Sequence, residues 1–310
     1  MPRSGYASLI GRPNAGKSTL LNRIIGTKVA IVSDKPQTTR NRILAVKNYD
    51  DGQIVFVDTP GIHRPLHRLN VRMVDAAVET LREVDVVALV FDASTKPGHG
   101  DEFVTNLLTD LETPVVLVLN KIDLVAKTRL LPLMEQVQRW REFAAIVPVS
   151  AATGDGVERL EQVLLAQMSE GEPGFPDDYL TDQPERALVA ETVREKVLQN
   201  TRAELPFSTA VVVDEFDERE RILRLYCTIY VETESQKPIV IGRAGDMIKR
   251  IGTEARHDLE KFFGVKVFLD LRVKVNAAWR DNDRVLDDIG VPRTETKPSR
   301  GSRRSRRPKT

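Results

Sequence analysis

The sequence has little of several features that mark whole classes of protein. It contains one cysteine, Cys227, which excludes an intrachain disulfide framework and a cysteine-based zinc site and favours a reducing cytoplasm. The net charge is +1, so no overall field attracts nucleic acid, and such a site must be a local patch. The longest apolar runs, such as 84–91, are far too short to span a membrane, and no signal peptide is expected because the N-terminus lacks an apolar segment.

Length and composition predict a globular protein of about two domains. The chain has 310 residues, of which 41% are hydrophobic and 29% charged. A stretch rich in proline, glycine and acidic residues, 170–178, predicts a linker. We therefore expect a first domain over 1–170, a linker over 171–183, a second domain over 184–290 and a basic, disordered tail over 291–310.

Residues 11–18 read GRPNAGKS and match the phosphate-binding motif G-x-x-x-x-G-K-[ST]. An apolar strand is expected before the motif at 6–10, and a helix after it at 18–25. Glycines let successive backbone N–H groups point at phosphate oxygens, and the helix N-terminus adds partial positive charge. We expect Lys17 to reach the outer phosphates and the Ser18 hydroxyl to ligate Mg²⁺.

Strands and helices alternate along the rest of the first domain. We expect strands at 43–49, 53–57, 84–91, 114–119 and 145–149, and helices at 66–82, 100–111, 130–143 and 156–168. This alternation predicts an α/β fold of the P-loop NTPase kind, with a mostly parallel sheet and helices on both faces. Ligands bind such sheets beyond the carboxyl ends of the strands, where each motif of this domain falls.

The N-K-x-D motif at 120–123 predicts guanine as the base. The Asp123 carboxylate can accept hydrogen bonds from the N1–H and 2-amino groups of guanine, whereas adenine would leave this charged acceptor unpaired. We expect the Lys121 stem to lie along the base and Asn120 to brace the loops. Ser150 follows the next strand, and the backbone N–H of Ala151 is suitably placed for the guanine carbonyl.

Two further segments predict a switch that senses the γ-phosphate. Asp58 ends a strand facing the phosphates and is expected to hold Mg²⁺, and the Gly61 N–H is expected to meet the γ-phosphate. Of Thr38 and Thr39, we expect Thr39 to complete the Mg²⁺ shell. Such contacts hold two loops only while the γ-phosphate is present. The alternative is that 38–40 is an ordinary polar loop.

Ile62 stands where Ras-like switches carry the glutamine that orients water, and isoleucine cannot do this. Here the sequence resembles translation-factor-related GTPases that have a hydrophobic residue at this place. In some of them an asparagine of the phosphate loop supplies a K⁺ ligand, and Asn14 matches it. The alternative role for Asn14 is to brace the loop, and either reading predicts slow intrinsic turnover.

The expected contacts can be gathered by role. Those to GTP or GDP are Asn14, Ala15, Gly16, Lys17, Ser18, Thr19, Asp58, Gly61, Asn120, Lys121, Asp123, Ser150 and Ala151. The expected Mg²⁺ ligands are Ser18, Thr39 and Asp58, and the expected switch residues are Thr38, Thr39 and Ile62.

The second domain has the order helix, two strands, two helices, strand. We expect a helix at 184–200, strands at 207–213 and 221–231 joined by a polar connection at 214–220, a helix at 253–263 and a strand at 265–275. The G-x-x-G turn at 242–245 lies between two helices. This order and turn resemble a KH domain of the prokaryotic topology (type II, α+β), in which the turn clamps a single-stranded backbone.

The residues expected to contact RNA are Gly242, Arg243, Ala244, Gly245, Lys249 and Arg250. The apolar Ile239, Ile241 and Ile248 either line a groove for bases or belong to the core of a helix–turn–helix corner. The arginine-rich segment 300–309 either adds a phosphate contact without sequence preference or only increases solubility.

The chain from residue 1 to about 290 resembles the Era family of bacterial GTPases. The resemblance rests on the motifs above, on 36–40 (PQTTR) and 58–63 (DTPGIH), and on 194–196 (REK) and 204–207 (ELPF) of the second domain. It implies GTP hydrolysis, binding near the 3′ end of 16S ribosomal RNA and a role in maturing the 30S subunit. It also implies peripheral association with the inner membrane. We expect a cytoplasmic monomer, and the basic tail departs from the family pattern.

The sequence leaves two alternative functions. In the first, a GTPase with the same switch serves RNA modification or a membrane process, although the second half shows no cysteine nucleophile beyond Cys227 and no metal cluster. The second is a P-loop kinase, against which the N-K-x-D motif argues.

Overall fold

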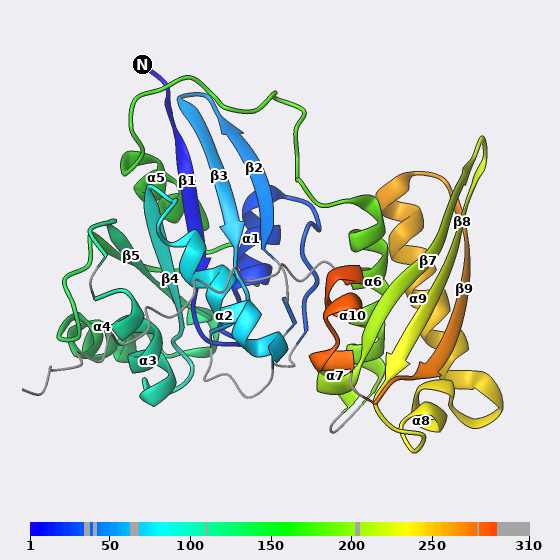
Figure 1. The fold of residues 1–310 in the computed structure, drawn as a ribbon. Coiled ribbons are helices and arrows are strands. Elements are labelled where there is room, and N and C mark those ends of the chain that lie inside the picture. The colour runs from blue at the N-terminus through cyan, green and yellow to red at the C-terminus, as the bar shows by residue number, and fades with distance from the viewer. Residues whose placement is uncertain are drawn as a thin grey trace, which may run out of the picture.

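The computed structural model describes residues 1–33, 38–39, 42–62, 68–109, 111–201, 205–277 and 279–289. Pro36, Gln37, Arg40, His63 and the tail 291–310, which carry parts of the predictions above, lie outside these residues. The described chain forms two lobes, and residues of the linker pass over one end of the molecule between them (Figure 1). No helix of the described chain is long and apolar enough to cross a membrane.

The first lobe is built on a six-stranded sheet of order β2-β3-β1-β4-β5-β6. Its strands are β1 (Arg3–Ile10), β2 (Ile43–Tyr49), β3 (Gly52–Asp58), β4 (Val86–Asp92), β5 (Val115–Asn120) and β6 (Ala145–Pro148). β2 runs antiparallel to β3, as the expected hairpin requires, and the other neighbours are parallel. The predicted mostly parallel α/β sheet is therefore confirmed.

Helices cover both faces of this sheet (Figure 1). They are α1 (Lys17–Ile25), α2 (Arg68–Thr80), α3 (His99–Leu107), α4 (Leu130–Gln138) and α5 (Val157–Ala166), with short turns η1 (Ile122–Leu124) and η2 (Lys127–Arg129). Alternate residues of β4 enter opposite cores. Val86, Ala88 and Val90 pack in the core that contains α1 and α5, whereas Val87, Leu89 and Phe91 pack in the core of α3 and α4. A strand buried on both faces therefore reads as a continuous apolar run.

Two helices are shorter than predicted. α3 ends at Leu107 and α4 at Gln138, whereas the apolar spacing predicted ends at 111 and 143. The apolar residues beyond α4 still pack in the core, because Trp140 meets the ring of Phe91 edge-on at a centroid distance of 5.9 Å. Spacing alone cannot separate a helical turn from a loop that buries the same side chains.

The second lobe is a three-stranded sheet of order β7-β8-β9 with helices on one face. Its elements are α6 (Glu185–Asn200), α7 (Leu205–Ser208), β7 (Ala210–Arg219), β8 (Ile222–Val231), α8 (Lys237–Ile241), the turn η3 (Arg243–Gly245), α9 (Asp246–Phe263) and β9 (Lys266–Val275). β7 is antiparallel and β9 parallel to β8. The chain continues into η4 (Trp279–Asp281) and α10 (Asp283–Asp288).

The structure corrects two predictions for the second lobe. The segment 205–208, whose last residues were expected to start a strand, is the short helix α7. The segment 214–220 was expected to be a connection, but most of it belongs to β7, with a bulge between Val213 and Glu215. A strand at the exposed end of a hairpin can consist of charged residues, because neither of its faces there packs on a core. Its sequence then lacks the apolar alternation from which a strand is predicted.

The segment after α5 is attached to the first lobe. The Val46 N–H donates to the Leu180 carbonyl at 3.0 Å, which adds a short extended stretch beside β2. Phe175 and Tyr179 stack with ring centroids 4.7 Å apart and pack on apolar residues of β2 and β3. The segment is therefore held along its course between the lobes.

Candidate functional site

The phosphate-binding loop connects β1 to α1 and depends on two glycines. Gly16 has φ 93°, and a Cβ there would lie 2.2 Å from Asn120 Nδ2. A Cβ on Gly11 would lie 2.4 Å from the Val90 carbonyl oxygen. The loop thus passes too close to β4 and to the last residue of β5 for residues larger than glycine at these two positions.

Lys17 starts α1 and lies buried under this loop. Its ammonium donates to the carbonyl oxygens of Gly11 and Arg12 at 3.2 and 3.1 Å. Arg12 also forms a 3.0 Å ion pair with Asp101 of α3, which fixes the other side of the loop. The loop therefore holds a positive charge at the position where the outer phosphates are expected.

Ser18, Thr39 and Asp58 converge at the start of α1. The Ser18 hydroxyl lies 2.8 Å from both Thr39 Oγ1 and Asp58 Oδ2. Within the described chain, Asp58 Oδ1 is buried without a hydrogen-bond partner. Hard oxygen ligands with unused acceptor capacity suit Mg²⁺, which fits the predicted ligand set.

Burial disfavours the ionised forms of Asp58 and Lys17 at this centre. It raises the pKa of Asp58 above its usual range, while the charge of Lys17 and hydrogen bonds from Ser18 and Thr39 oppose only part of the effect. Burial also lowers the pKa of Lys17, against the charge of Asp58. Both shifts disfavour the charged forms, so a bound cation and phosphates would relieve a strain present in the protein alone.

Asn120 ties three loops together at the end of β5. Its Nδ2 donates to the Ala15 carbonyl at 2.9 Å, and its Oδ1 accepts the Ala151 N–H at 3.0 Å. The N–H expected to meet the guanine carbonyl is thus already engaged, and a base would share it. Beside it, the Ser150 hydroxyl donates to Asp123 Oδ1 at 2.6 Å and orients the carboxylate expected to read guanine.

Asp92, which the sequence analysis missed, positions Lys121. Lys121 has φ 65°, and its ammonium forms a 2.6 Å ion pair with Asp92 Oδ2. Burial raises the pKa of Asp92, but hydrogen bonds from Lys121 and Ser94 outweigh it and leave that pKa below its ordinary value. Asp92 pairs in register with Asn120 of the neighbouring strand, so two adjacent strands that end in polar residues were the available signal.

These elements enclose a cavity of about 360 Å³. It is lined by Pro13, Asn14, Gly16, Lys17, Ser18, Thr19, Ile31, Val32, Ser33, Thr38, Thr39, Gly61 and Lys121. Eight of these residues were predicted to contact the phosphates or Mg²⁺ or to form the switch, and Lys121 was predicted to contact the base. Residues 31–33 were not predicted, because they belong to no motif. Asn22 of α1 positions that loop, since its Oδ1 accepts the N–H groups of Val29 and Ala30 at 2.9 Å.

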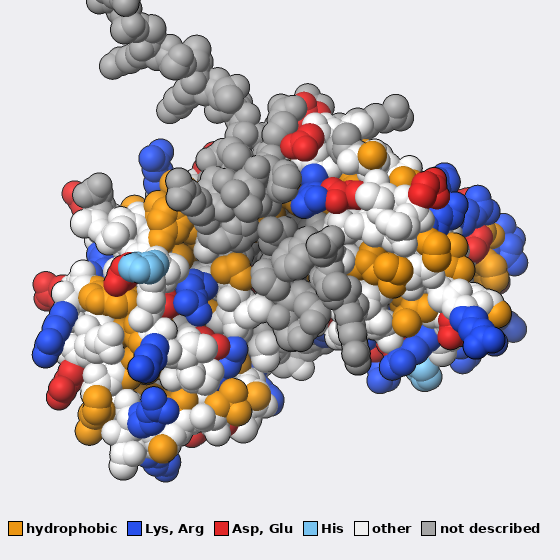
Figure 2. Space-filling model, turned by 90° about the horizontal axis from the view of Figure 1, so that it is seen from below, with side chains coloured by type: hydrophobic (Ala, Val, Ile, Leu, Met, Phe, Trp, Pro, Cys, Tyr) orange, Lys and Arg blue, Asp and Glu red, His pale blue; other side chains and the backbone are white. Residues whose placement is uncertain are grey.

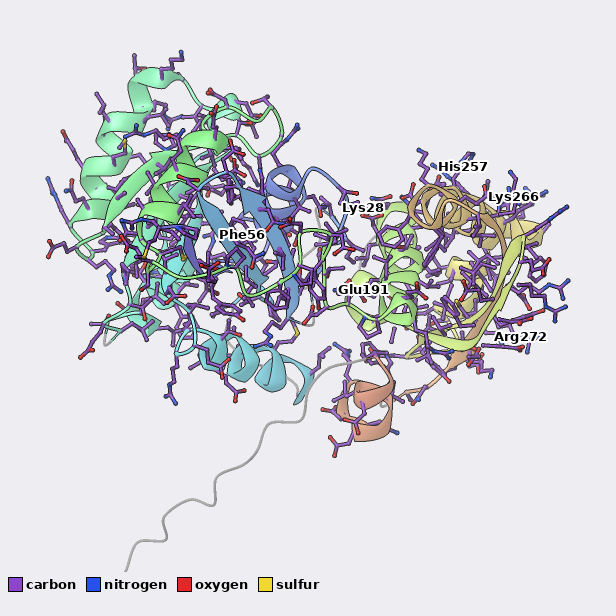
Figure 3. The ribbon with its side chains drawn as sticks, turned by 90° about the horizontal axis from the view of Figure 1, so that it is seen from above. Lys28, Phe56, Glu191, His257, Lys266 and Arg272 are labelled. Carbon is purple, nitrogen blue, oxygen red and sulfur yellow. The ribbon has the colours of Figure 1, made fainter. Side chains whose placement is uncertain are left out.

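The same loop contacts the second lobe through α6. Lys28 lies between the lobes (Figure 3) and forms ion pairs with Glu195 and Asp258 at 2.5 and 3.0 Å. Arg194 is 1% exposed, donates to the Thr38 carbonyl and pairs with Glu191, which Figure 3 shows on the side of α6 that faces the first lobe. A helix of the second lobe therefore holds the backbone of a predicted switch residue.

A second contact joins α2 to the end of the described chain. Leu69 and Met73 of α2 share a buried cluster with Trp279 and Leu286. The Trp279 indole N–H donates to the Ser208 carbonyl at 2.9 Å. The helix that follows the 58–62 motif thus packs directly on the second lobe.

The G-x-x-G turn joins α8 to α9. Gly242 has φ 79°, and a Cβ there would lie 2.6 Å from the Met247 backbone nitrogen. Gly245 has φ 80°, but a Cβ there would meet no atom within 4 Å. Gly242 is therefore required by packing, whereas Gly245 keeps the outside of the turn open. Arg243, Ala244, Lys249 and Arg250 are exposed around it.

A groove of about 720 Å³ lies between α9 and β9. It is lined by Ile222, Ile248, Lys249, Gly252, Thr253, Arg256, Glu260, Lys266, Val267, Phe268, Leu269 and Leu271. Ile248 thus lies in the groove, whereas Ile239 and Ile241 do not line it. Apolar residues of β9 take their place.

Comparisons with known proteins cover both lobes. A family described as 50S ribosome-binding GTPase matches residues 6–121, and the KH domain family matches residues 204–280. The chain is 52% identical over 289 residues to GTPase Era of Geobacter sp. (strain M21), covering 93% of this chain and 97% of that protein. It is 51% identical to GTPase Era of Geotalea uraniireducens (strain Rf4), with the same coverage.

Two solved structures have nearly the same fold over the whole described chain. One is a crystal structure of Era in complex with MgGDPNP and nucleotides 1506–1542 of 16S ribosomal RNA, with a TM-score of 0.91, 41% identity, and coverage of 94% of this chain and 99% of that chain. The other is a variant of Aquifex aeolicus Era bound to GDP·AlF4−, with a TM-score of 0.89, 41% identity, and coverage of 93% and 99%. The similarity therefore extends through both lobes and the segment between them.

Proposed function

The chain belongs to the Era family of GTPases, and from this premise we propose that it binds the 3′ end region of 16S ribosomal RNA under control of GTP and assists maturation of the 30S subunit. GTP hydrolysis to GDP and phosphate is the activity of the first domain. The second domain is a KH domain, and its groove and G-x-x-G turn are the proposed RNA site.

In the proposed nucleotide site, Lys17 binds the outer phosphates and the Asp123 carboxylate binds guanine. Ser18, Thr39 and Asp58 would hold Mg²⁺, which when bound neutralises charge on the phosphates. The converging oxygens and the unpartnered Asp58 Oδ1 support this assignment. Asn120 and Asp92 act indirectly, because they position the loop and Lys121.

Hydrolysis by this site should be slow without a further group. Ile62 is 2% exposed, packs in the core, and donates its N–H to the Gly11 carbonyl at 3.2 Å. Its side chain is a hydrocarbon and has no polar atom with which to orient water. We propose that Asn14, which lines the cavity, supplies an oxygen ligand to K⁺, and that the bound K⁺ would add positive charge beside the phosphates.

The observation that carries the switch is the bond from Arg194 to the Thr38 carbonyl. Thr38 precedes the proposed Mg²⁺ ligand Thr39, and Arg194 belongs to α6, which packs on the KH sheet. A change in the 38–39 backbone when the γ-phosphate leaves would change the hydrogen bond between Arg194 of α6 and the Thr38 carbonyl. Nucleotide state and RNA binding are thereby coupled, and the coupling acts in both directions.

We place this activity in the cytoplasm, where its ribosomal RNA would be encountered. Contact with the inner face of the membrane remains a prediction of the family resemblance alone. The experiment that tests the proposal measures binding to a fragment of the 16S 3′ end and to a fragment of the same composition in scrambled order, each with a non-hydrolysable GTP analogue and with GDP. We expect preference for the natural order and a difference between nucleotides, and equal affinity in all four cases would contradict the proposal.

A further inference from the structure

The face of the KH sheet that the helices leave uncovered carries two aromatic rings. Along β8, Leu225 and Cys227 are buried in the core, so Tyr226 between them points to the opposite face. Along β9, Val267 is 5% exposed and the next residue, Phe268, is 46% exposed. The rings of Tyr226 and Phe268 lie side by side, with centroids 5.8 Å apart and planes tilted by 58°.

One end of this face is covered and the other is open. Ala210 and Tyr230 lie in the cluster around Trp279, so η4 and α10 cover that end of the sheet. The Tyr226–Phe268 pair lies outside that cluster. Within the described chain, Phe268 of this pair is exposed and Tyr226 is half-buried.

Charges of both signs lie on this face: Asp270 of β9 pairs in register with Tyr226, and Asp217 of β7 pairs with Arg224. Lys266, Arg272 and Lys274 are exposed along β9, where Arg272 makes a 3.4 Å ion pair with Asp270. Arg224 is the direct neighbour of Phe268 in the β8–β9 register. Glu215 and Asp217 lie along β7. Tyr226 therefore has the acidic Glu215 and Asp270 as its register neighbours, whereas Phe268 has the basic Arg224 beside it. Lys266 and Arg272 both lie at the outer end of the lobe (Figure 3).

The same edge belongs to the groove. Lys266 and Phe268 are among the residues that line the groove between α9 and β9. Both are exposed and alternate along β9 with the buried Val267. The lobe shows hydrophobic side chains with lysines and arginines gathered toward the end far from the first domain (Figure 2). A single-stranded RNA that leaves the groove at this edge would next contact the aromatic pair and the cations.

We propose that Phe268, Tyr226 and the adjacent Arg224 and Lys266 extend the RNA-binding groove over its β9 edge, where one unpaired base stacks on the aromatic rings and its phosphate binds the two cations. This inference rests on the proposed RNA binding of the KH domain. Aromatic side chains beside arginines stack bases without requiring a particular sequence, because every base has a π-face. The site would lengthen the bound RNA by one nucleotide beyond the segment held in the groove.

The test compares two sets of single-stranded oligonucleotides from the 16S 3′ end: a short one that fills only the groove, and longer ones extended at either end. Each longer one carries 2-aminopurine at one successive position, because stacking on a ring quenches its fluorescence. We expect quenching at one position outside the groove segment. Tyr226→Leu with Phe268→Leu should abolish it and weaken the longer RNA about tenfold, while the short RNA loses much less.

Two controls keep this outcome separate from others. Phe262→Leu makes the same change at a phenylalanine that is 40% exposed but does not line the groove, and it should alter neither RNA. Gly245→Asp should weaken the binding of both RNAs. If it weakened neither, the G-x-x-G turn would not be the clamp, and the aromatic site would be judged by quenching at the extra position alone. Quenching at no position, or quenching and affinity unchanged in the double variant, would overturn the inference.

Discussion

Glu195 of α6 in the second lobe accepts a hydrogen bond from the backbone N–H of Val32 in the first lobe at 2.8 Å, across 163 positions of sequence. The carboxylate is 2% exposed and also faces the ammonium groups of Lys28 and Lys196 at 2.5 and 3.2 Å. Val32 lines the nucleotide cavity. One buried side chain of α6 thus fixes the wall of the nucleotide site.

The first prediction concerns this contact. Glu195→Ala should lower the free energy of unfolding by about 2 kcal/mol, because a charged hydrogen bond is lost and Lys28 keeps fewer partners. It should also reduce the difference in RNA affinity between the GTP-analogue and GDP states. Denaturant unfolding and RNA titration measure the two effects. Glu185→Ala, an exposed glutamate of the same helix, serves as the control, and an unchanged nucleotide effect on RNA would show that α6 does not transmit the switch.

A second prediction concerns the base. Asp123→Asn should weaken GTP strongly and improve xanthosine triphosphate, whose 2-carbonyl can accept from the new amide. Ser150→Ala is the matched test of orientation, because it removes the 2.6 Å hydrogen bond to Asp123 but keeps the carboxylate. It should weaken GTP modestly without favouring xanthosine triphosphate. Unaltered GTP affinity in Asp123→Asn would refute the base assignment.

Residues at the ends of parallel strands could be placed from the sequence, because one strand–loop–helix unit largely determines each of them. The phosphate loop, Asp58 and the N-K-x-D motif all end strands of this kind. Asp92 could not be found in this way. Its function depends on the β4–β5 register, which sets it opposite Asn120 and within 2.6 Å of Lys121.

Contacts between the domains were also beyond the sequence. The segment 194–196 was visible only as part of a family resemblance, and no spacing rule connects it with Val32 or Thr38. The stretch 171–183 was expected to be a linker by its composition, yet Phe175 and Tyr179 pack on β2 and β3. The charged end of β7 was missed because its side chains face solvent.

A third prediction concerns the cost of a buried carboxylate. The pKa of Asp58 is higher in the folded protein than the 3.8 of an exposed aspartate, so the folded state binds the proton more tightly. Stability contributed by this group is therefore lost as pH rises from below 3.8 through the folded pKa, and the ionised group destabilises the nucleotide-free protein at neutral pH.

Asp58→Asn removes that charge. The nucleotide-free variant should melt a few degrees higher at pH 7, since about 1 kcal/mol shifts the melting temperature of a domain of this size by about 2–4 °C. Its Mg²⁺-dependent affinity for GTP should fall. Asp177→Asn, at an exposed position of the linker, is the control. A lower melting temperature for Asp58→Asn would mean that Lys17 compensates the carboxylate fully.

A fourth prediction concerns the monovalent cation. If Asn14 supplies a K⁺ ligand, replacing K⁺ by Na⁺ should slow GTP turnover of the intact protein. Asn14 has φ 63°, so Asn14→Gly removes the amide without straining the backbone. Turnover of that variant should be slow and insensitive to the cation, with GTP affinity little changed. Equal rates of the intact protein in the two salts would leave Asn14 with a bracing role.

The last prediction separates the two glycines of the RNA clamp. Gly242→Ala should destabilise the KH domain, because its Cβ would lie 2.6 Å from the Met247 nitrogen at a φ of 79°. Gly245→Asp should cost some stability, because its φ of 80° strains any side chain, but it should not prevent folding, because the space around its Cβ is open. It would place bulk and negative charge where RNA phosphates approach. RNA affinity should then fall strongly at low salt.

Gly245→Asn is the matched control, since asparagine tolerates a positive φ and adds similar bulk without charge. It should weaken RNA less than aspartate does, and the difference should shrink as salt rises because only the repulsion is screened. GTP hydrolysis without RNA should be unchanged in both variants, because the contacts to the first domain come from α6, α9 and η4 rather than from this turn. If folded Gly245→Asp retained full RNA affinity, the turn would not be the clamp and the basic edge of β9 would become the principal RNA surface.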